Sequence, residues 1–84
     1  MTRYTVVWPQ SALADLADIW LKSGDPNAVT SAAAIIDRDL AENAPQKGLE
    51  LSEGLRAYYA EPLRVLFAVR DDDRIVEVLR VKRS

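Results

Sequence analysis

The amino-acid sequence predicts an α+β domain: an N-terminal strand, an antiparallel helical hairpin, and a three-stranded antiparallel meander, with the helices packed on one face of the sheet. Three observations support this prediction. A β-branched and aromatic segment opens the chain, and two segments with apolar residues at helical spacing follow it. From Gly54 onward the apolar period changes to two. Because 84 residues can bury only one small core, we expect residues 1–84 to form a single domain.

The first strand is expected over residues 4–8 and ends at Pro9. Ser11 is the expected N-cap of a helix over residues 12–22, and Gly24 is expected to end this helix in a left-handed conformation. Its apolar side chains recur at helical spacing and form one stripe that is expected to face the core: Leu13, Leu16, Ala17 and Trp20, widened by Ala12 and Ile19.

The second helix is expected to begin with Asp25 as its N-cap and Pro26 in its first turn, and to continue to about Asn43. Its apolar stripe comprises Val29, Ala32, Ala33, Ile36 and Leu40. The connection between the two helices is short, so they are expected to pack as an antiparallel hairpin.

Residues 45–53 are predicted to be a loop held in place by Leu49 and Leu51. Three strands are expected after it, over residues 55–60, 63–69 and 74–82. The middle one is apolar on both faces, as in a central strand. The face of the sheet away from the helices is expected to be open to water or to a partner.

The composition excludes several classes of site. The chain has no cysteine, which rules out disulfides, thiol nucleophiles and thiolate metal sites, and no histidine, the commonest general base and metal ligand. We therefore expect neither a metal nor another cofactor. No apolar segment is long enough to cross a bilayer, and the N-terminus does not resemble a signal peptide, so we expect a cytoplasmic protein without a membrane partner.

The net charge of −2 conceals an asymmetry between the two halves of the chain. Residues 1–53 carry four basic and eight acidic side chains, whereas residues 54–84 carry seven basic and five acidic ones. An anionic partner is therefore expected to meet the C-terminal half. The alternative is that arginines simply solvate a small sheet.

Basic side chains on the three predicted strands are the main candidates for chemistry. The residues expected to bind RNA or another target are Arg56, Tyr58, Arg64, Arg80 and Lys82. Either Tyr58 or its neighbour Tyr59 could stack on a base or donate a proton. Strict alternation places Arg80 and Lys82 on the same face as Val76 and Val78, and Arg83 on the other. The alternative is that each arginine covers apolar sheet surface or pairs with an acid.

Other candidates have simpler interpretations. The run Asp71–Asp73 is expected to be a solvated turn, because three consecutive side chains in a tight turn cannot all ligate one ion. Asp15 and Asp18 are expected to face water, and Trp8 and Trp20 to anchor the core.

The order and spacing of these elements resemble the RelE/ParE superfamily of bacterial type II toxin–antitoxin toxins, which includes plasmid stabilisation proteins. The segments that carry the resemblance are residues 4–8, 12–19, 54–56, 62–69 and 75–81. The resemblance covers nearly the whole chain. It implies a growth-inhibiting toxin that a cognate antitoxin neutralises, typically by wrapping it with an amphipathic helix and an extended strand.

The resemblance implies one of two activities. A ParE-like toxin binds a cellular target such as DNA gyrase, whereas a RelE-like toxin is a metal-independent endonuclease that cleaves mRNA on the ribosome. In the RelE-like case the catalytic residues are expected to be Arg64, Lys82 and Arg83. Only one base lies within residues 56–59, and no terminal tyrosine or histidine follows the last strand, which favours the ParE-like activity.

A third possibility is an inactive member that acts as a binding module. Whether the protein is an enzyme therefore stays open at this stage. So does its oligomeric state, with a homodimer among the alternatives.

Overall fold

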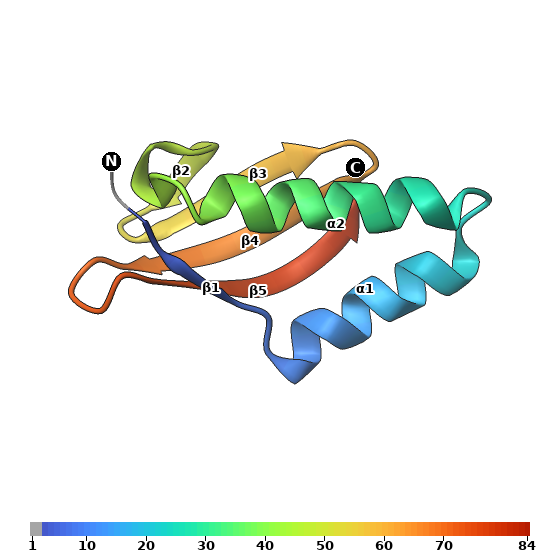
Figure 1. Ribbon diagram of the computed structural model, residues 1–84, viewed down its shortest axis with the longest axis horizontal. Helices are drawn as coiled ribbons and strands as arrows, with labels where there is room; N and C mark the ends of the chain where they lie inside the picture. The colour runs from blue at the N-terminus through green and yellow to red at the C-terminus, as the bar shows by residue number, and fades with distance from the viewer. Residues whose placement is uncertain (1–2) are drawn as a thin grey trace.

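Five strands and two helices make up the part of the chain that the computed structural model describes, residues 3–84 (Figure 1). The elements in chain order are β1 (Thr5–Val7), α1 (Gln10–Lys22), α2 (Pro26–Leu40), a 3₁₀ turn (Ala44–Gln46), β2 (Leu49–Ser52), β3 (Leu55–Ala60), β4 (Leu63–Arg70) and β5 (Ile75–Arg83). The predicted α+β class is confirmed.

The strands form one sheet in the order β1-β5-β4-β3-β2. Strands β3, β4 and β5 make the predicted antiparallel meander, and β1 lies parallel to the first part of β5, with Thr5 opposite Ile75. Strand β4 therefore lies at the centre of the sheet, as its apolar character on both faces predicts.

Both helices lie on the same face of the sheet and run antiparallel to each other (Figure 1). Helix α1 packs on β5, and α2 packs on β3 and β4. Apolar side chains from both layers form the core between them, and the largest fully buried ones are Val29, Ile36, Leu40, Leu63, Val65, Phe67, Val76 and Val78. Among the described residues, no helix is long and apolar enough to cross a membrane.

The ends of α1 differ from the prediction. The helix begins at Gln10 rather than after Ser11, because the Pro9 carbonyl accepts the first helical hydrogen bond, from the Leu13 amide at 3.0 Å. At the other end Ser23 adopts an extended conformation, so Gly24 does not form the expected left-handed cap. The Ser23 hydroxyl instead accepts a hydrogen bond from the Asp25 amide at 2.9 Å and so orders the link to α2.

The predicted start of α2 is confirmed, since the Asp25 carboxylate accepts a hydrogen bond from the Ala28 amide at 3.2 Å and Pro26 occupies the first turn. The helix ends at Leu40, earlier than expected. Asn43, the expected last residue, has a left-handed backbone with φ of 59° and leads into the 3₁₀ turn.

Residues 45–53 are not the predicted loop. They contain β2, which pairs with β3 at the edge of the sheet, with Leu49 opposite Ala57. Leu49 and Leu51 do not anchor this segment in the core, because their side chains are 64% and 52% exposed. The segment is held instead by its backbone hydrogen bonds to β3.

Only part of the apolar stripe predicted for α1 faces the core, namely Ala12, Ile19 and the half-buried Leu16. Ala12 and Ile19 are the buried residues of this helix, whereas Leu13 and Trp20 are 45% and 44% exposed. Trp20 is therefore not a core anchor; its indole nitrogen donates to the Thr30 hydroxyl at 3.2 Å, at the surface of α2. Trp8 packs against the core only in part.

Gly48 allows the chain to enter β2 close to β3, and its replacement is expected to destabilise the fold. Its φ is +69°, and a Cβ atom there would lie 2.0 Å from the Ala57 carbonyl oxygen. We expect Gly48→Ala to lower the free energy of unfolding by at least about 1–3 kcal/mol, measured by urea denaturation. The matched control is Gly24→Ala, where no atom lies within 4 Å of the added carbon. A Gly48→Ala variant as stable as this control would contradict the prediction.

Candidate functional site

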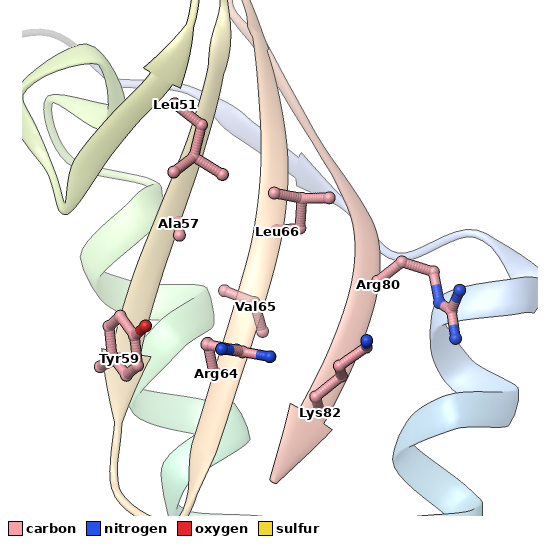
Figure 2. A pocket seen from close by; sticks show the side chains of 8 residues that line it. All are labelled: Leu51, Ala57, Tyr59, Arg64, Val65, Leu66, Arg80 and Lys82. Atoms are coloured by element: carbon pink, nitrogen blue, oxygen red, sulfur yellow. The ribbon is translucent and has the colours of Figure 1, made fainter. Parts of the chain in front are cut away.

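The open face of the sheet carries a groove of about 450 Å³ (Figure 2). Its lining residues come from β2, β3, β4 and β5: Leu51, Ala57, Tyr59, Arg64, Val65, Leu66, Arg80 and Lys82. Strands β2 and β3 therefore contribute only apolar and aromatic side chains, whereas all three basic side chains come from β4 and β5, beside the apolar Val65 and Leu66 of β4.

Strand register brings the polar members of the groove together. Arg64 lies directly opposite Lys82 on β5 and opposite Tyr59 on β3. Leu66, two residues along β4, lies opposite Arg80. Directly opposed residues of an antiparallel pair have neighbouring side chains on one face, so these groups form two adjacent rows. Figure 2 shows the Arg64 guanidinium extending across the sheet toward β5.

A β-bulge in β5 decides which residues reach the groove. Phe67 pairs with Val78 and Leu66 pairs with Arg80, so Leu79 is an extra residue in β5. Strict alternation, which places Arg80 on the same face as Val78, is therefore wrong here. Val78 is completely buried beneath the helices, whereas Arg80 lies on the open face.

The same correction applies to the neighbouring residues of β5. Val76 lies in the core with Val78, so neither exposes apolar surface on the open face. After the bulge, Val81 returns to the core and Lys82 lines the groove. Arg83 lies opposite Leu63, a core residue of β4, and is exposed outside the groove.

Of the residues predicted for binding, the structure brings together Arg64, Arg80 and Lys82, and it places two others elsewhere. Arg56 lies on the other face, where its guanidinium donates to the carbonyl oxygens of Lys47 at 2.7 Å and Gly48 at 3.1 Å. This arginine therefore holds the chain at the start of β2.

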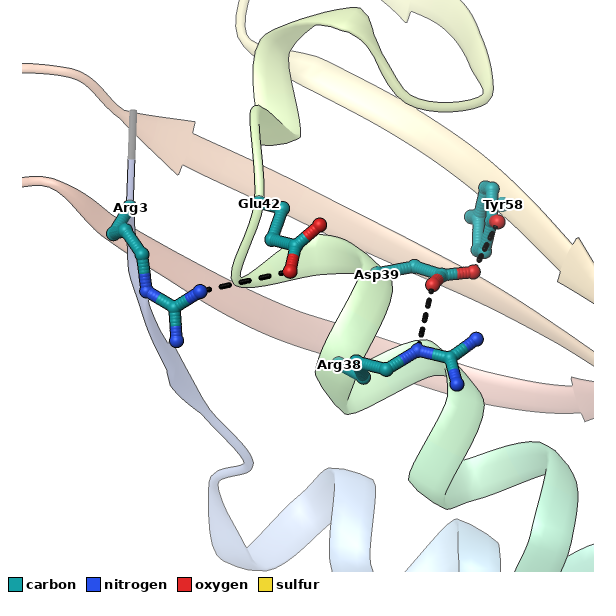
Figure 3. A network of polar contacts seen from close by, with 5 residues as sticks. All are labelled: Arg3, Arg38, Asp39, Glu42 and Tyr58. Carbon is teal, nitrogen blue, oxygen red and sulfur yellow. Dashed lines mark hydrogen bonds and ion pairs between the residues drawn. The ribbon is translucent and has the colours of Figure 1, made fainter. Parts of the chain in front are cut away.

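Tyr58 also lies on the helical face, in a polar network at the C-terminal end of α2 (Figure 3). Its hydroxyl donates to the Asp39 carboxylate at 2.6 Å, and Arg38 contacts the other oxygen of Asp39 at 3.3 Å. The bond from Tyr58, more than the one from Arg38, holds the pKa of Asp39 below its ordinary value of 3.8, and the same bond raises the pKa of Tyr58. Nearby, Arg3 pairs with Glu42 at 3.5 Å.

Tyr59, the alternative to Tyr58, is outside the predicted binding set but is the tyrosine that lines the groove. Two adjacent tyrosines necessarily point to opposite faces of a strand, and Arg64, which lies opposite Tyr59, is predicted for the open face. Register therefore selects Tyr59, not Tyr58, for the groove, and its side chain is 57% exposed there.

Asp15 does not face water as predicted. Its Oδ2 atom accepts hydrogen bonds from the Arg80 Nε at 2.9 Å and from the Val81 amide at 3.1 Å. The bond from Val81, followed by the one from Arg80, lowers the pKa of Asp15. Helix α1 therefore contacts the basic edge of the groove through a charged side chain. Asp18, in contrast, pairs with Lys22 at 3.1 Å on the exposed side, as predicted.

The turn at Asp71–Asp73 is not a metal site within the described residues, where no suitable cluster of ligands occurs. Asp71 accepts a hydrogen bond from the Tyr4 hydroxyl, and this bond raises the pKa of Tyr4. The Arg74 guanidinium lies 5.7 Å from the centre of the Tyr4 ring. These contacts join the turn to the N-terminal strand.

A second groove, of about 410 Å³, lies between α1 and α2. Its lining is almost wholly apolar: Leu13, Leu16, Ala17, Trp20, Leu21, Val29, Thr30 and Ala33. This exposed groove is therefore lined by four residues predicted for the core stripe of α1, of which only Leu16 also packs against the core. A contiguous apolar surface of this kind is typical of an interaction site.

Comparison with known proteins gives one family. The family model described as the ParE toxin of the type II toxin–antitoxin system parDE matches residues 6–84. No curated protein sequence matches the chain.

Three solved structures have a similar fold. The toxin–antitoxin complex RelBE2 from Mycobacterium tuberculosis is 23% identical, with a TM-score of 0.77, over 100% of this chain and 94% of that one. The chromosomal ParDE system from P. aeruginosa is 22% identical, with a TM-score of 0.73, over 96% of each chain. A mutant of E. coli RelE in the free state is 16% identical, with a TM-score of 0.66, over 99% and 84%.

The network around Asp39 predicts a specific response to acid. Because the pKa of Asp39 is lowered in the folded state, its contribution to stability is present above pH 3.8 and is lost as pH falls through the folded pKa. Tyr58→Phe removes the main cause, so we expect it to reduce the free energy of unfolding by about 1–2 kcal/mol at pH 7. The difference from the wild type should shrink in acid, as measured by urea denaturation at a series of pH values.

The control is Tyr59→Phe, whose hydroxyl lies on the exposed side of the same strand. We expect this variant to remain within about 0.5 kcal/mol of the wild type at every pH. Equal losses in the two variants, or a Tyr58→Phe difference that does not depend on pH, would count against the assigned role of the Tyr58–Asp39 bond.

Proposed function

The chain belongs to the ParE toxin family of type II toxin–antitoxin systems, and from this membership we propose that it inhibits growth by binding a protein target on the open face of its sheet. The proposed target is DNA gyrase, which the resemblance to ParE toxins implies. A cognate antitoxin neutralises the toxin.

The observation that carries this proposal is the composition of the sheet groove. Tyrosine and arginine line the groove together with leucine, Tyr59 and Arg64 with the exposed Leu51 and the half-buried Leu66. Residues of the first two kinds are enriched among those that dominate protein–protein binding energy. The basic side of the groove complements an acidic surface on the target, and the apolar side supplies area to bury.

A second candidate function is mRNA cleavage. It is favoured by the close placement of Arg64, Lys82 and Tyr59, since the two cations can stabilise the charge that develops on a phosphate during cleavage. Tyr59 offers an aromatic face for stacking on a base. The chain contains no histidine to act as the general base, so we rank this function second.

The groove between α1 and α2 is the proposed site for the antitoxin. It is apolar and elongated between two helices, and a peptide helix with one apolar face fits such a groove. The solved RelBE2 relative is a toxin–antitoxin complex, which supports an antitoxin as the partner. Covering Leu13, Trp20 and Leu21, the exposed large apolar residues of α1, would remove their surface from water.

Arg64 provides the test of the target site. Under induced expression without antitoxin we expect the wild type to arrest growth, and Arg64→Ala to weaken target binding about tenfold or more and relieve the arrest. The matched control is Arg70→Ala, since Arg70 lies on the same strand and face but pairs with Glu77 at 3.0 Å and does not line the groove.

Two further measurements in the same cells separate the two functions. Changed plasmid supercoiling with intact mRNA supports gyrase as the target. Intact supercoiling alongside cleaved mRNA would replace the first proposal with the second. A folded Arg64→Ala protein that is fully toxic would remove the sheet groove from both.

The antitoxin site is tested by a charge at the rim of the helical groove. We expect Leu13→Glu, at a position that is 45% exposed, to leave the fold and toxicity unchanged but to abolish rescue by the co-expressed antitoxin. Ala14→Glu is the control, because Ala14 is exposed on the same helix outside the groove. Antitoxin binding is measured by isothermal titration. Equal affinity of both variants for the antitoxin would place the antitoxin elsewhere.

A further inference from the structure

The Asp15 carboxylate of α1 forms an ion pair with Arg80, one of the three cations in the sheet groove. The Asp15 Oδ2 atom lies 2.9 Å from the Arg80 Nε and 3.1 Å from the Val81 amide nitrogen. Figure 2 shows the Arg80 side chain turned toward α1 and away from Arg64. The Asp15 side chain is only 23% exposed, whereas that of Arg80 is 58% exposed. The carboxylate is thus the fixed partner and the arginine the more accessible one.

Asp15 also supplies a hydrogen-bond acceptor to a backbone amide at the edge of the sheet. Strand β1 pairs with β5 only as far as Glu77, so the outer edge of β5 beyond that residue has no neighbouring strand. Asp15 accepts a hydrogen bond from the Val81 amide on this part of β5. The Asp15 carboxylate thus binds two groups that follow the bulge at Leu79: the side chain of Arg80 and the backbone amide of Val81.

We propose that Asp15 is a positioning residue of the sheet groove, which holds Arg80 against α1 and leaves Arg64 and Lys82 as the two cations that meet an anionic group of the target. This inference rests on the proposed function of the groove. Among residues 3–84, neither Arg64 nor Lys82 forms an ion pair, although they lie opposite each other on adjacent strands. Two unpaired cations side by side repel, and an oxyanion bound between them relieves that repulsion.

The direct test uses inorganic phosphate as the oxyanion and NMR of the arginine Nε groups in the purified protein. In the wild type we expect phosphate to shift the Arg64 Nε signal and leave that of Arg80 unchanged. Asp15→Asn keeps an oxygen acceptor for the Val81 amide but removes the charge. In this variant the Arg80 signal should also shift, and phosphate should bind about two- to five-fold more tightly, the gain that one exposed charge contact supplies.

A higher phosphate affinity in Asp15→Asn would show that Asp15 positions Arg80 and does not merely stabilise the fold, because a damaged fold would weaken phosphate binding. The matched control is Asp18→Asn, one turn along α1, where the lost partner is Lys22 on the exposed side. This variant should bind phosphate as the wild type does. An Arg80 signal that already responds in the wild type as strongly as that of Arg64 would overturn the proposal, and so would an Asp15→Asn protein with unchanged affinity.

If Asp15→Asn does not fold, Arg80→Gln in the wild-type background decides the question. We expect its phosphate affinity to be unchanged, because Arg80 is already engaged, and a clear loss would overturn the proposal. The phosphate titration does not depend on toxicity. Failure of the Arg64→Ala growth test with a positive titration would therefore reject the proposed function and leave the role of Asp15 intact.

Discussion

The extra residue in β5 is the constraint on which both faces of this sheet depend. Before the bulge at Leu79, alternate side chains of β5 enter the core, and after it the opposite set does. Without the bulge, a strand that buries Val76 and Val78 would also direct Arg80 into the apolar layer beneath the helices. Burial of an unpaired guanidinium costs a large amount of free energy. The bulge avoids this cost, because it allows one strand to direct valines into the core and Arg80 to the surface.

Helix α1 connects the two candidate surfaces. Its buried residues, Ala12 and Ile19, fix it to the sheet, while Leu13 and Trp20 face the groove beside α2. Between these two sides, Asp15 reaches the edge of β5. The helix therefore lines the groove beside α2 with apolar side chains, and through Asp15 it holds Arg80 at the edge of the sheet groove. The groove proposed for the antitoxin and the groove proposed for the target are therefore both in contact with this one helix.

Local patterns predicted most of this fold, and the failures have physical causes. Periodicity identified both helices and the meander, because these elements bury one regular face. It missed β2, whose residues are all exposed, since an edge strand held mainly by backbone hydrogen bonds has no apolar signature. Arg64, Arg80 and Lys82 line one groove, whereas Arg56 and Tyr58, predicted with them, lie on the other face. Strict alternation also grouped Val76 and Val78 with Arg80, although both valines lie in the core. A bulge changes alternation and depends on pairing with β4, which the sequence of β5 does not specify.

The side chains of the groove match the proposed binding of a protein target better than the second candidate, mRNA cleavage. Cleavage of a phosphodiester requires a group that accepts a proton as well as groups that stabilise charge. The groove has cations in Arg64 and Lys82, while Asp15, the carboxylate bonded to Arg80, also accepts a hydrogen bond from the Val81 amide. Among the described residues that line the groove, none carries a carboxylate or an imidazole. The apolar half, with Leu51 and Leu66, adds buried area that strengthens binding of a protein surface but does not assist cleavage.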